Sequence, residues 1–194
     1  MSIIALTNDT LAGTPGAGQI EYNGQFFGTD SNASRAQMQR ITLGTAQAST
    51  SGTSIDFTGI PSWVKRITVM FQGVSTSGTS NKLVQIGSGS VTTSGYISSG
   101  INYGGTSNGS VVSSTAGFII LSANAADTIS GTLVLTNVSG NIWVSSHTVK
   151  TSTTFTAFGG GDITLSGTLD RVRITTVNGT DTFDAGSINI LYEG

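Results

Sequence analysis

From about residue 46 onward, hydrophobic and polar residues alternate in short runs, and turns rich in Gly, Ser, Thr and Asn separate these runs. Successive side chains of a β-strand point to opposite faces, so this alternation predicts strands that bury one face. The expected strands lie within 55–57, 67–72, 82–86, 117–122, 132–136, 142–145, 162–165, 169–177 and 187–192. Many short strands at close spacing predict an all-β fold, an antiparallel β-sandwich of the jelly-roll type. We expect the Asn178-Gly179 turn to fold the last two strands into a hairpin.

Residues 1–45 have a different pattern. Two short apolar runs flank Asn23-Gly24, a pair that tolerates positive φ and therefore favours a tight hairpin turn. The segment 30–40 begins with an Asp cap and ends with a basic residue, which predicts one short helix. A hairpin with one helix buries too little to be stable alone in water. We therefore expect 1–45 to be a docking segment on other chains, and 46–194 to be the sandwich domain.

The composition narrows the function. Only 9% of residues are charged, against about 25% in an average soluble domain, yet 37% are hydrophobic, which is enough for a core. The net charge of −2 offers no basic surface for nucleic acid. No apolar run approaches the roughly 18 residues of a membrane span, and the first residues lack a secretory signal pattern. With no cysteine available for disulfides, we expect the stability of the protein to come from oligomerisation.

Several stretches resemble a module of tail-fibre and other virion proteins of tailed bacteriophages. They are Ser51–Phe71, which reads SGTSIDFTGIPSWVKRITVMF, then Asn81–Gly87 with Ser94–Tyr96, and Ser166–Ile174 continuing through Ile188–Tyr192. Separately, Gly16–Phe27, which reads GAGQIEYNGQFF, is similar to a hairpin found just upstream of phage fibre domains. The resemblance implies a place in a virion, a homotrimer and, in many members, contact with the host surface. It does not indicate a chemical reaction, and it does not specify the part of the virion.

The sequence offers few groups for catalysis. Its single histidine, His147, is expected on the same strand face as Trp143 and Ser145, either at the surface or with its hydrogen bonds satisfied. There is no Gly-x-Ser-x-Gly elbow for a serine nucleophile, and one histidine without cysteine is too few ligands for an ordinary zinc site. We therefore expect no catalytic residues, no metal and no cofactor.

Carboxylates are the remaining catalytic alternative, because tailspikes of phages cleave polysaccharides with Asp and Glu. The aspartates of this chain are dispersed and stand mostly in turn contexts, where Asp commonly accepts hydrogen bonds from backbone amides. Asp181 and Asp184 lack the dense oxygen ligands of a calcium loop. The rung repeat of a long parallel β-helix is absent as well. These patterns favour a protein that is not an enzyme.

Binding is the more favoured activity. Tyr96 and Tyr103 are expected to project from the Gly- and Ser-rich stretch 87–110, and a tyrosine both stacks on a sugar and donates a hydrogen bond. We therefore assign them as receptor-binding residues; the alternative is that they are strand or trimer-interface residues. Trp63 is expected to anchor a corner of the core, and 155–161 to be a strand end followed by a flexible turn.

The sequence thus predicts a virion structural protein of a bacteriophage, a tail-fibre or tail-tip subunit that contributes to attachment to the host surface. Its expected partners are other virion proteins through residues 1–45, two further copies in a homotrimer, and a glycan or protein of the host. Two alternatives remain open: a capsid decoration or head-fibre protein, and a stand-alone carbohydrate-binding module. A polysaccharide-degrading tailspike domain is a third.

Overall fold

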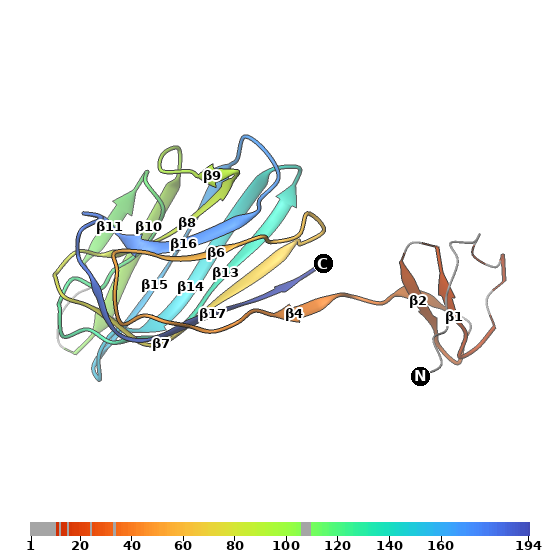
Figure 1. The fold of residues 1–194 in the computed structure, drawn as a ribbon. Coiled ribbons are helices and arrows are strands. Elements are labelled where there is room, and N and C mark those ends of the chain that lie inside the picture. Colours follow the sequence, from red (N-terminus) through yellow and green to blue (C-terminus); the bar gives the residue numbers. More distant parts are fainter. Residues whose placement is uncertain (1–10, 12, 15, 24, 33, 106–109) are drawn as a thin grey trace. The chain divides into compact units, whose positions relative to one another are not determined.

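The computed structural model describes residues 11, 13–14, 16–23, 25–32, 34–105 and 110–194. The described residues form strands and turns and contain no helix, which confirms the all-β prediction. The chain divides into two compact units, residues 1–40 and residues 41–194, and each has its own sheet structure (Figure 1).

The first unit is a three-stranded antiparallel sheet. Strands β1 (Ile20–Tyr22) and β2 (Phe26–Thr29) form the expected hairpin, and β3 (Arg35–Gln37) pairs with the free edge of β2. The helix predicted over 30–40 is wrong. Asp30 Oδ1 accepts hydrogen bonds from the backbone nitrogens of residues 32 and 34, at 2.9 and 2.8 Å, so this carboxylate closes a turn between strands.

The second unit is an antiparallel sandwich of two sheets that face each other, as predicted. Within the described residues, the larger sheet has nine strands in the order β11-β10-β15-β14-β13-β7-β17-β4, with β5 also paired to β17. Its strands are β4 (Ile41–Leu43), β5 (Gln47–Ala48), β7 (Arg66–Thr76), β10 (Ile97–Gly104), β11 (Val111–Ser114), β13 (Ile129–Ser139), β14 (Ile142–Lys150), β15 (Phe155–Thr164) and β17 (Phe183–Glu193).

The smaller sheet has five strands in the order β12-β8-β16-β6, with β9 also paired to β8, again counted over the described residues. Its strands are β6 (Ile55–Thr58), β8 (Lys82–Ser88), β9 (Ser90–Val91), β12 (Phe118–Ile120) and β16 (Arg171–Thr176). In Figure 1 this sheet lies over the long strands of the larger one.

The alternation in the sequence sets which side chains form the core. On β7, Ile67 and Val69 are buried between the sheets, while the residues between them are more exposed. On β16, Val172 and Ile174 face the same core from the opposite sheet. A strand that alternates with a period of two buries one face, so the core contains the apolar positions of both sheets.

Two local predictions are corrected. The turn at Asn178-Gly179 does not join a hairpin, because β16 belongs to the smaller sheet and β17 to the larger, so this connection crosses between sheets. The three glycines Gly159–Gly161 do not form a flexible turn. They continue β15 and pair with β10 on one side and β14 on the other.

Candidate functional site

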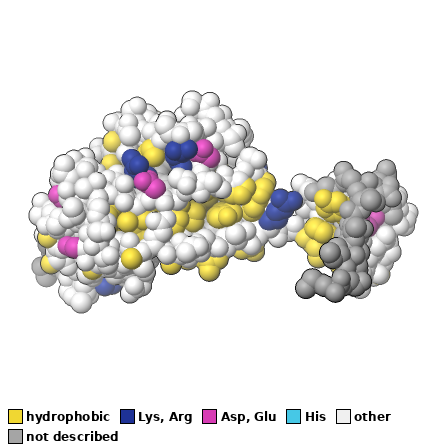
Figure 2. All heavy atoms as spheres, in the orientation of Figure 1, with side chains coloured by type: hydrophobic (Ala, Val, Ile, Leu, Met, Phe, Trp, Pro, Cys, Tyr) yellow, Lys and Arg dark blue, Asp and Glu magenta, His cyan; other side chains and the backbone are white. Residues whose placement is uncertain are grey.

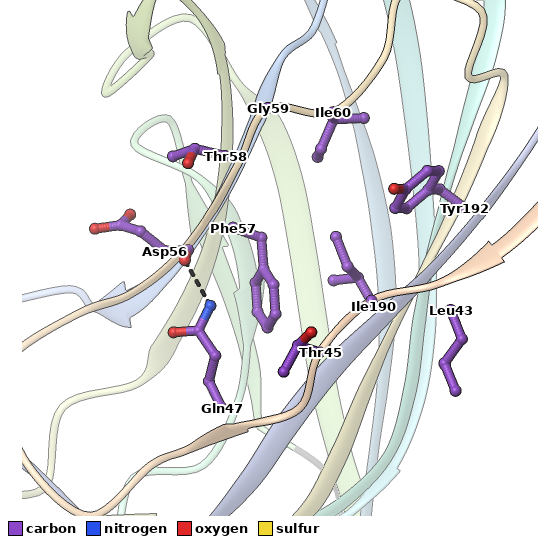
Figure 3. A pocket seen from close by; sticks show the side chains of 11 residues that line it. Leu43, Thr45, Gln47, Asp56, Phe57, Thr58, Gly59, Ile60, Ile190 and Tyr192 are labelled. Atoms are coloured by element: carbon purple, nitrogen blue, oxygen red, sulfur yellow. Dashed lines mark hydrogen bonds between the residues drawn. The ribbon is translucent and has the colours of Figure 1, made fainter.

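A groove of the 41–194 unit lies where an edge of the larger sheet faces an edge of the smaller one (Figure 3). It has a volume of about 400 Å³, which is within the usual range for small-ligand pockets. Three segments line it: the β4–β5 segment, β6 with the turn after it, and the end of β17. The lining residues are Leu43, Gly44, Thr45, Gln47, Asp56, Phe57, Thr58, Gly59, Ile60, Ile190 and Tyr192.

The β4–β5 segment packs tightly on β17 because Gly44 has no side chain. A Cβ at this position would lie 3.1 Å from the carbonyl oxygen of Ile190, closer than most Cβ contacts. The Gly44 nitrogen donates to that oxygen at 2.8 Å, and the Asn189 side chain donates to the Gly44 oxygen at 3.0 Å. These bonds fix one wall of the groove.

The Gln47 side chain connects the two walls. Its Nε2 donates to the backbone oxygen of Asp56 on β6 at 2.7 Å, as Figure 3 shows. This bond occupies an acceptor on the free edge of β6 and leaves Gln47 Oε1 as a second polar atom at the groove. One backbone acceptor on the free edge of β6 therefore already has a hydrogen-bond partner within the protein.

The groove has an apolar floor and hydroxyl groups around it. Phe57, Ile60 and Ile190 are buried and form the floor. Thr45 and Tyr192 supply hydroxyl groups, and neither hydroxyl has a hydrogen-bond partner among the described residues. Thr58 follows Asp56 on the outer face of β6, and in Figure 3 its side chain points to the same side as the Asp56 carboxylate. In Figure 2 hydrophobic side chains form a band between β6 and β4, while most of the remaining visible surface is neither hydrophobic nor charged.

The groove presents no free charge. Among its described lining residues only Asp56 is ionisable to a carboxylate, and in Figure 3 this carboxylate points away from the Phe57 ring. It is held by Arg173, with Nε to Oδ1 at 2.7 Å and Nη2 to Oδ2 at 2.9 Å. The hydrogen bonds that Arg173 donates to Asp56 raise the pKa of Arg173 above its usual value. The pair lies on the outer face of the smaller sheet.

Trp63 supports the groove from behind Tyr192. The centroids of their rings are 5.8 Å apart with a tilt of 48°, and both side chains are partly buried against the core. This placement agrees with the expectation that Trp63 anchors a corner. It also fixes the ring of Tyr192, because aromatic pairs in a tilted arrangement attract each other.

Tyr96 does not project from a loop, so that prediction is wrong. Its side chain is 1% exposed and packs edge-on against Phe118, with ring centroids 5.1 Å apart. Burial raises the pKa of the Tyr96 phenol to about 12. A ring enclosed in this way is not available for stacking on a receptor in the structure described.

Tyr103 lies on β10 and is 62% exposed, on the outer face of the larger sheet. The two tyrosines that the sequence grouped together are therefore on different sides of the larger sheet, one in the core and one at the surface. Its role in receptor binding stays a prediction.

His147 shares the inner face of β14 with Trp143 and Ser145, as predicted, but it is neither exposed nor satisfied. It is 5% exposed, and neither ring nitrogen has a hydrogen-bond partner among the described residues. The ring lies over Gly159, where an added Cβ would be 2.7 Å from His147 Cε1. Burial lowers the pKa of His147 to about 4. No described carboxylate orients the ring as a general base requires.

A second polar cluster is buried near one end of β8. Lys82 Nζ donates to the backbone oxygen and to Oγ of Ser122, at 3.1 and 3.2 Å, and Ser122 Oγ donates to Asp127 at 3.1 Å. Burial lowers the pKa of Lys82, and the nearby carboxylate of Asp127 opposes that shift. Because Ser122 is fully buried, this cluster connects β8 to the β12–β13 loop rather than facing a substrate.

The carboxylates of the Asp181–Asp184 segment do not converge. Asp181 accepts hydrogen bonds from Asn178 Nδ2 at 2.6 Å and from the Ser80 nitrogen at 3.0 Å, and these bonds lower its pKa. Asp184 contacts the hydroxyl of Ser75. Within the described ranges, no group of three His, Cys, Asp or Glu residues is placed to hold a metal ion. No described helix has the length and hydrophobicity needed to cross a membrane.

Comparisons of the chain with models of known protein families, with curated proteins and with solved structures found no match. The groove was not predicted from the sequence. Its residues come from three segments more than 100 positions apart at the extremes, and no local motif indicates that they meet.

Proposed function

We propose that this protein is a structural subunit of a tailed-bacteriophage virion, a tail-fibre or tail-tip protein that contributes to attachment to the host surface. In this role residues 1–40 bind another virion protein, the sandwich extends the particle's binding surface, and no reaction is catalysed. The resemblance of the hairpin and of three sandwich segments to fibre modules supports this role. The observation that carries it is the exposed apolar face of the three-stranded sheet β1–β3 in residues 1–40.

That face is defined by the strand register. Tyr22 pairs with Phe26, and their rings are 5.0 Å apart; Met38 comes directly after the end of β3, and its nitrogen donates to the Phe26 oxygen at 2.8 Å. Ile20 lies two residues before Tyr22 on the same face. Ile20, Phe26 and Met38 are 63%, 46% and 49% exposed, and no apolar side chain is buried among the described residues of this unit.

The opposite face of the same sheet is mixed, with Phe27 paired to Glu21 on one side and to Gln37 on the other. Arg35 Nε lies 2.7 Å from Glu21 Oε2, in an ion pair between β3 and β1. A cluster of exposed apolar side chains on a small sheet is typical of a surface that becomes buried on assembly. The exposed cluster of Ile20, Phe26 and Met38 supports docking on a protein partner, which we assign as the adjacent virion protein.

We further propose that the sandwich forms a homotrimer through the outer face of its larger sheet. Three exposed or half-exposed apolar residues lie directly opposite one another on adjacent strands: Ile101 on β10 pairs with Phe158 on β15 and with Val111 on β11. Val111 is 69% exposed and Phe158 is 45% exposed. Few charged groups and no disulfides are present in the chain, so burial between copies is the simplest source of lasting stability.

The docking role is tested in the full chain with Phe26→Glu combined with Met38→Glu. Both side chains are exposed, so the 41–194 unit should fold as before. After density-gradient purification of particles, an immunoblot should show incorporation reduced by about tenfold or more, because each carboxylate is desolvated in an apolar contact. Ser31→Glu with Asn32→Glu adds the same charge in the exposed turn between β2 and β3, away from Phe26 and Met38, and should incorporate normally. Wild-type incorporation of the first variant would contradict the proposal.

The attachment role has a separate test. Purified wild-type chain, added to host cells before the particles, should slow adsorption in a concentration-dependent way. Adsorption that proceeds at the same rate at saturating chain concentration would contradict a role in host attachment, whatever the result of the docking test.

A further inference from the structure

The geometry points to the groove between β4–β5 and β6 as a binding site for an uncharged sugar residue of a cell-surface glycan. This inference rests on the proposed attachment function, and it names the site and the ligand class. It also moves the site of recognition away from the tyrosines that the sequence indicated, to residues that converge only in the folded chain.

The polar and apolar atoms of the groove are distributed as a sugar ring requires. A pyranose has apolar C–H faces and a rim of hydroxyl groups. The groove matches this with the partly buried ring of Tyr192 beside an apolar floor, and with the hydroxyls of Thr45 and Tyr192. An aromatic side chain provides both a surface for stacking and, in tyrosine, a hydrogen-bonding group. Gln47 Oε1 adds an acceptor at a fixed position, because Nε2 of the same amide is bound to Asp56.

The charge in the groove decides between a neutral and an ionic ligand. An ionic ligand that enters a partly apolar groove loses hydration, and it needs an opposite charge to compensate. The one carboxylate among the described lining residues, that of Asp56, accepts hydrogen bonds from Nε and Nη2 of Arg173 and points to the outer face. The groove therefore offers hydrogen bonds but no free charge, which favours a neutral sugar over an acidic one.

The edge of β6 is poorly suited to pairing with an added peptide strand. The free edge of β6 would be the place for such a strand, because edge strands expose unpaired backbone groups. The Asp56 carbonyl on that edge already accepts the hydrogen bond from Gln47 at 2.7 Å. The turn after β6 contains Gly59 with φ of +72°, which ends the extended edge at Thr58. An extended peptide would find few backbone partners here.

The test uses saturation-transfer-difference NMR on the full chain, with the methyl glycosides of glucose, galactose, mannose and N-acetylglucosamine as probes. We expect transfer to the ring protons of at least one glycoside. Tyr192→Ala, and separately Thr45→Val, should reduce that transfer by about tenfold. The matched control is Thr132→Val, which removes an exposed threonine hydroxyl from β13, outside the groove, and should retain it.

Each contrary result overturns the proposal. Absence of transfer from all four glycosides would do so, as would equal transfer in wild type and groove variants. An alternating Val-Thr hexapeptide is the second probe; transfer to this peptide and not to the glycosides would show that the groove accepts a strand. Circular dichroism of the Thr45→Val variant verifies that it is folded, and Thr45 is exposed, so loss of transfer there cannot be attributed to unfolding.

Adsorption competition with the same variants separates this inference from the proposed function. If wild-type chain and groove variants compete equally well with particles, attachment stands and the groove proposal fails. If glycosides bind in the groove but no form of the chain competes, the sugar site stands and the attachment function fails.

Discussion

The phenolic oxygen of Tyr96 lies 2.8 Å from the backbone nitrogen of Ile86, inside the sandwich. On this edge of β8, β12 pairs with residues 82–84 and β9 with residues 87–88, so Ile86 lies between two partner strands. The hydroxyl accepts from the Ile86 nitrogen and is within 3.1 Å of the Ile86 oxygen and 3.0 Å of the Thr92 oxygen. The Thr92 nitrogen donates to the Ile86 oxygen at 3.0 Å, and the Tyr96 hydroxyl supplies the acceptor for the Ile86 nitrogen that a neighbouring strand would otherwise provide.

This relationship predicts that Tyr96 is a stability residue. Tyr96→Phe keeps the ring but leaves the Ile86 amide buried without a partner, which should lower the free energy of unfolding by about 1–3 kcal/mol. Tyr103→Phe removes an exposed hydroxyl and should change it by about 0.5 kcal/mol or less. Urea denaturation followed by tryptophan fluorescence measures both. Equal midpoints for the two variants would show that the Tyr96 hydroxyl contributes nothing to stability.

His147 predicts an acid-sensitive fold. Its pKa in the folded chain is about 4, below the ordinary value of 6.5, so the unfolded chain binds the proton more tightly. Protonation of His147 therefore leaves the free energy of unfolding unchanged above about pH 6.5 and lowers it as the pH decreases towards 4. The full loss from this group is about 3 kcal/mol. His147→Leu removes the titrating ring, and its unfolding midpoint should fall less between pH 7 and pH 4.5. An identical pH dependence in both proteins would refute this assignment.

The outer face of the larger sheet makes a prediction about assembly. Sedimentation equilibrium of the purified chain at micromolar concentration should give a trimer. Phe158→Asp should shift it towards monomer, because a carboxylate replaces an apolar group in the centre of the proposed contact. Ser146→Asp on neighbouring β14 tests whether added charge alone is responsible, and it should perturb the trimer less. A wild-type chain that sediments only as monomer would count against trimerisation.

The strands could be predicted where burial produces alternation. Ile67 and Val69 on β7, and Val172 and Ile174 on β16, are recognisable because each pair is separated by one more polar residue. The Gly159–Gly161 segment of β15 escaped prediction because glycines carry no hydrophobic pattern. They are needed there for a reason that is visible only in three dimensions: His147 lies over Gly159 and leaves no room for a side chain.

Predictions from local sequence patterns were wrong where the structure depends on contacts with a distant element. The Asn178-Gly179 turn is present, but a turn signal does not specify whether the next strand pairs with the last or crosses to the other sheet. Tyr96 stands in a polar stretch, and only the fold brings it to Ile86. The groove is the same case on a larger scale, since Thr45 and Tyr192 come from opposite ends of the sandwich sequence.

The most direct test of the proposed role is to locate the chain on the particle. An antibody raised against residues 41–194 is incubated with purified virions, and the complexes are imaged by immunogold electron microscopy. The proposal predicts gold at the tail end of intact particles, and loss of that label from particles assembled with the Phe26→Glu and Met38→Glu chain. Infectious wild-type particles that carry no label, and no detectable chain on an immunoblot, would contradict it.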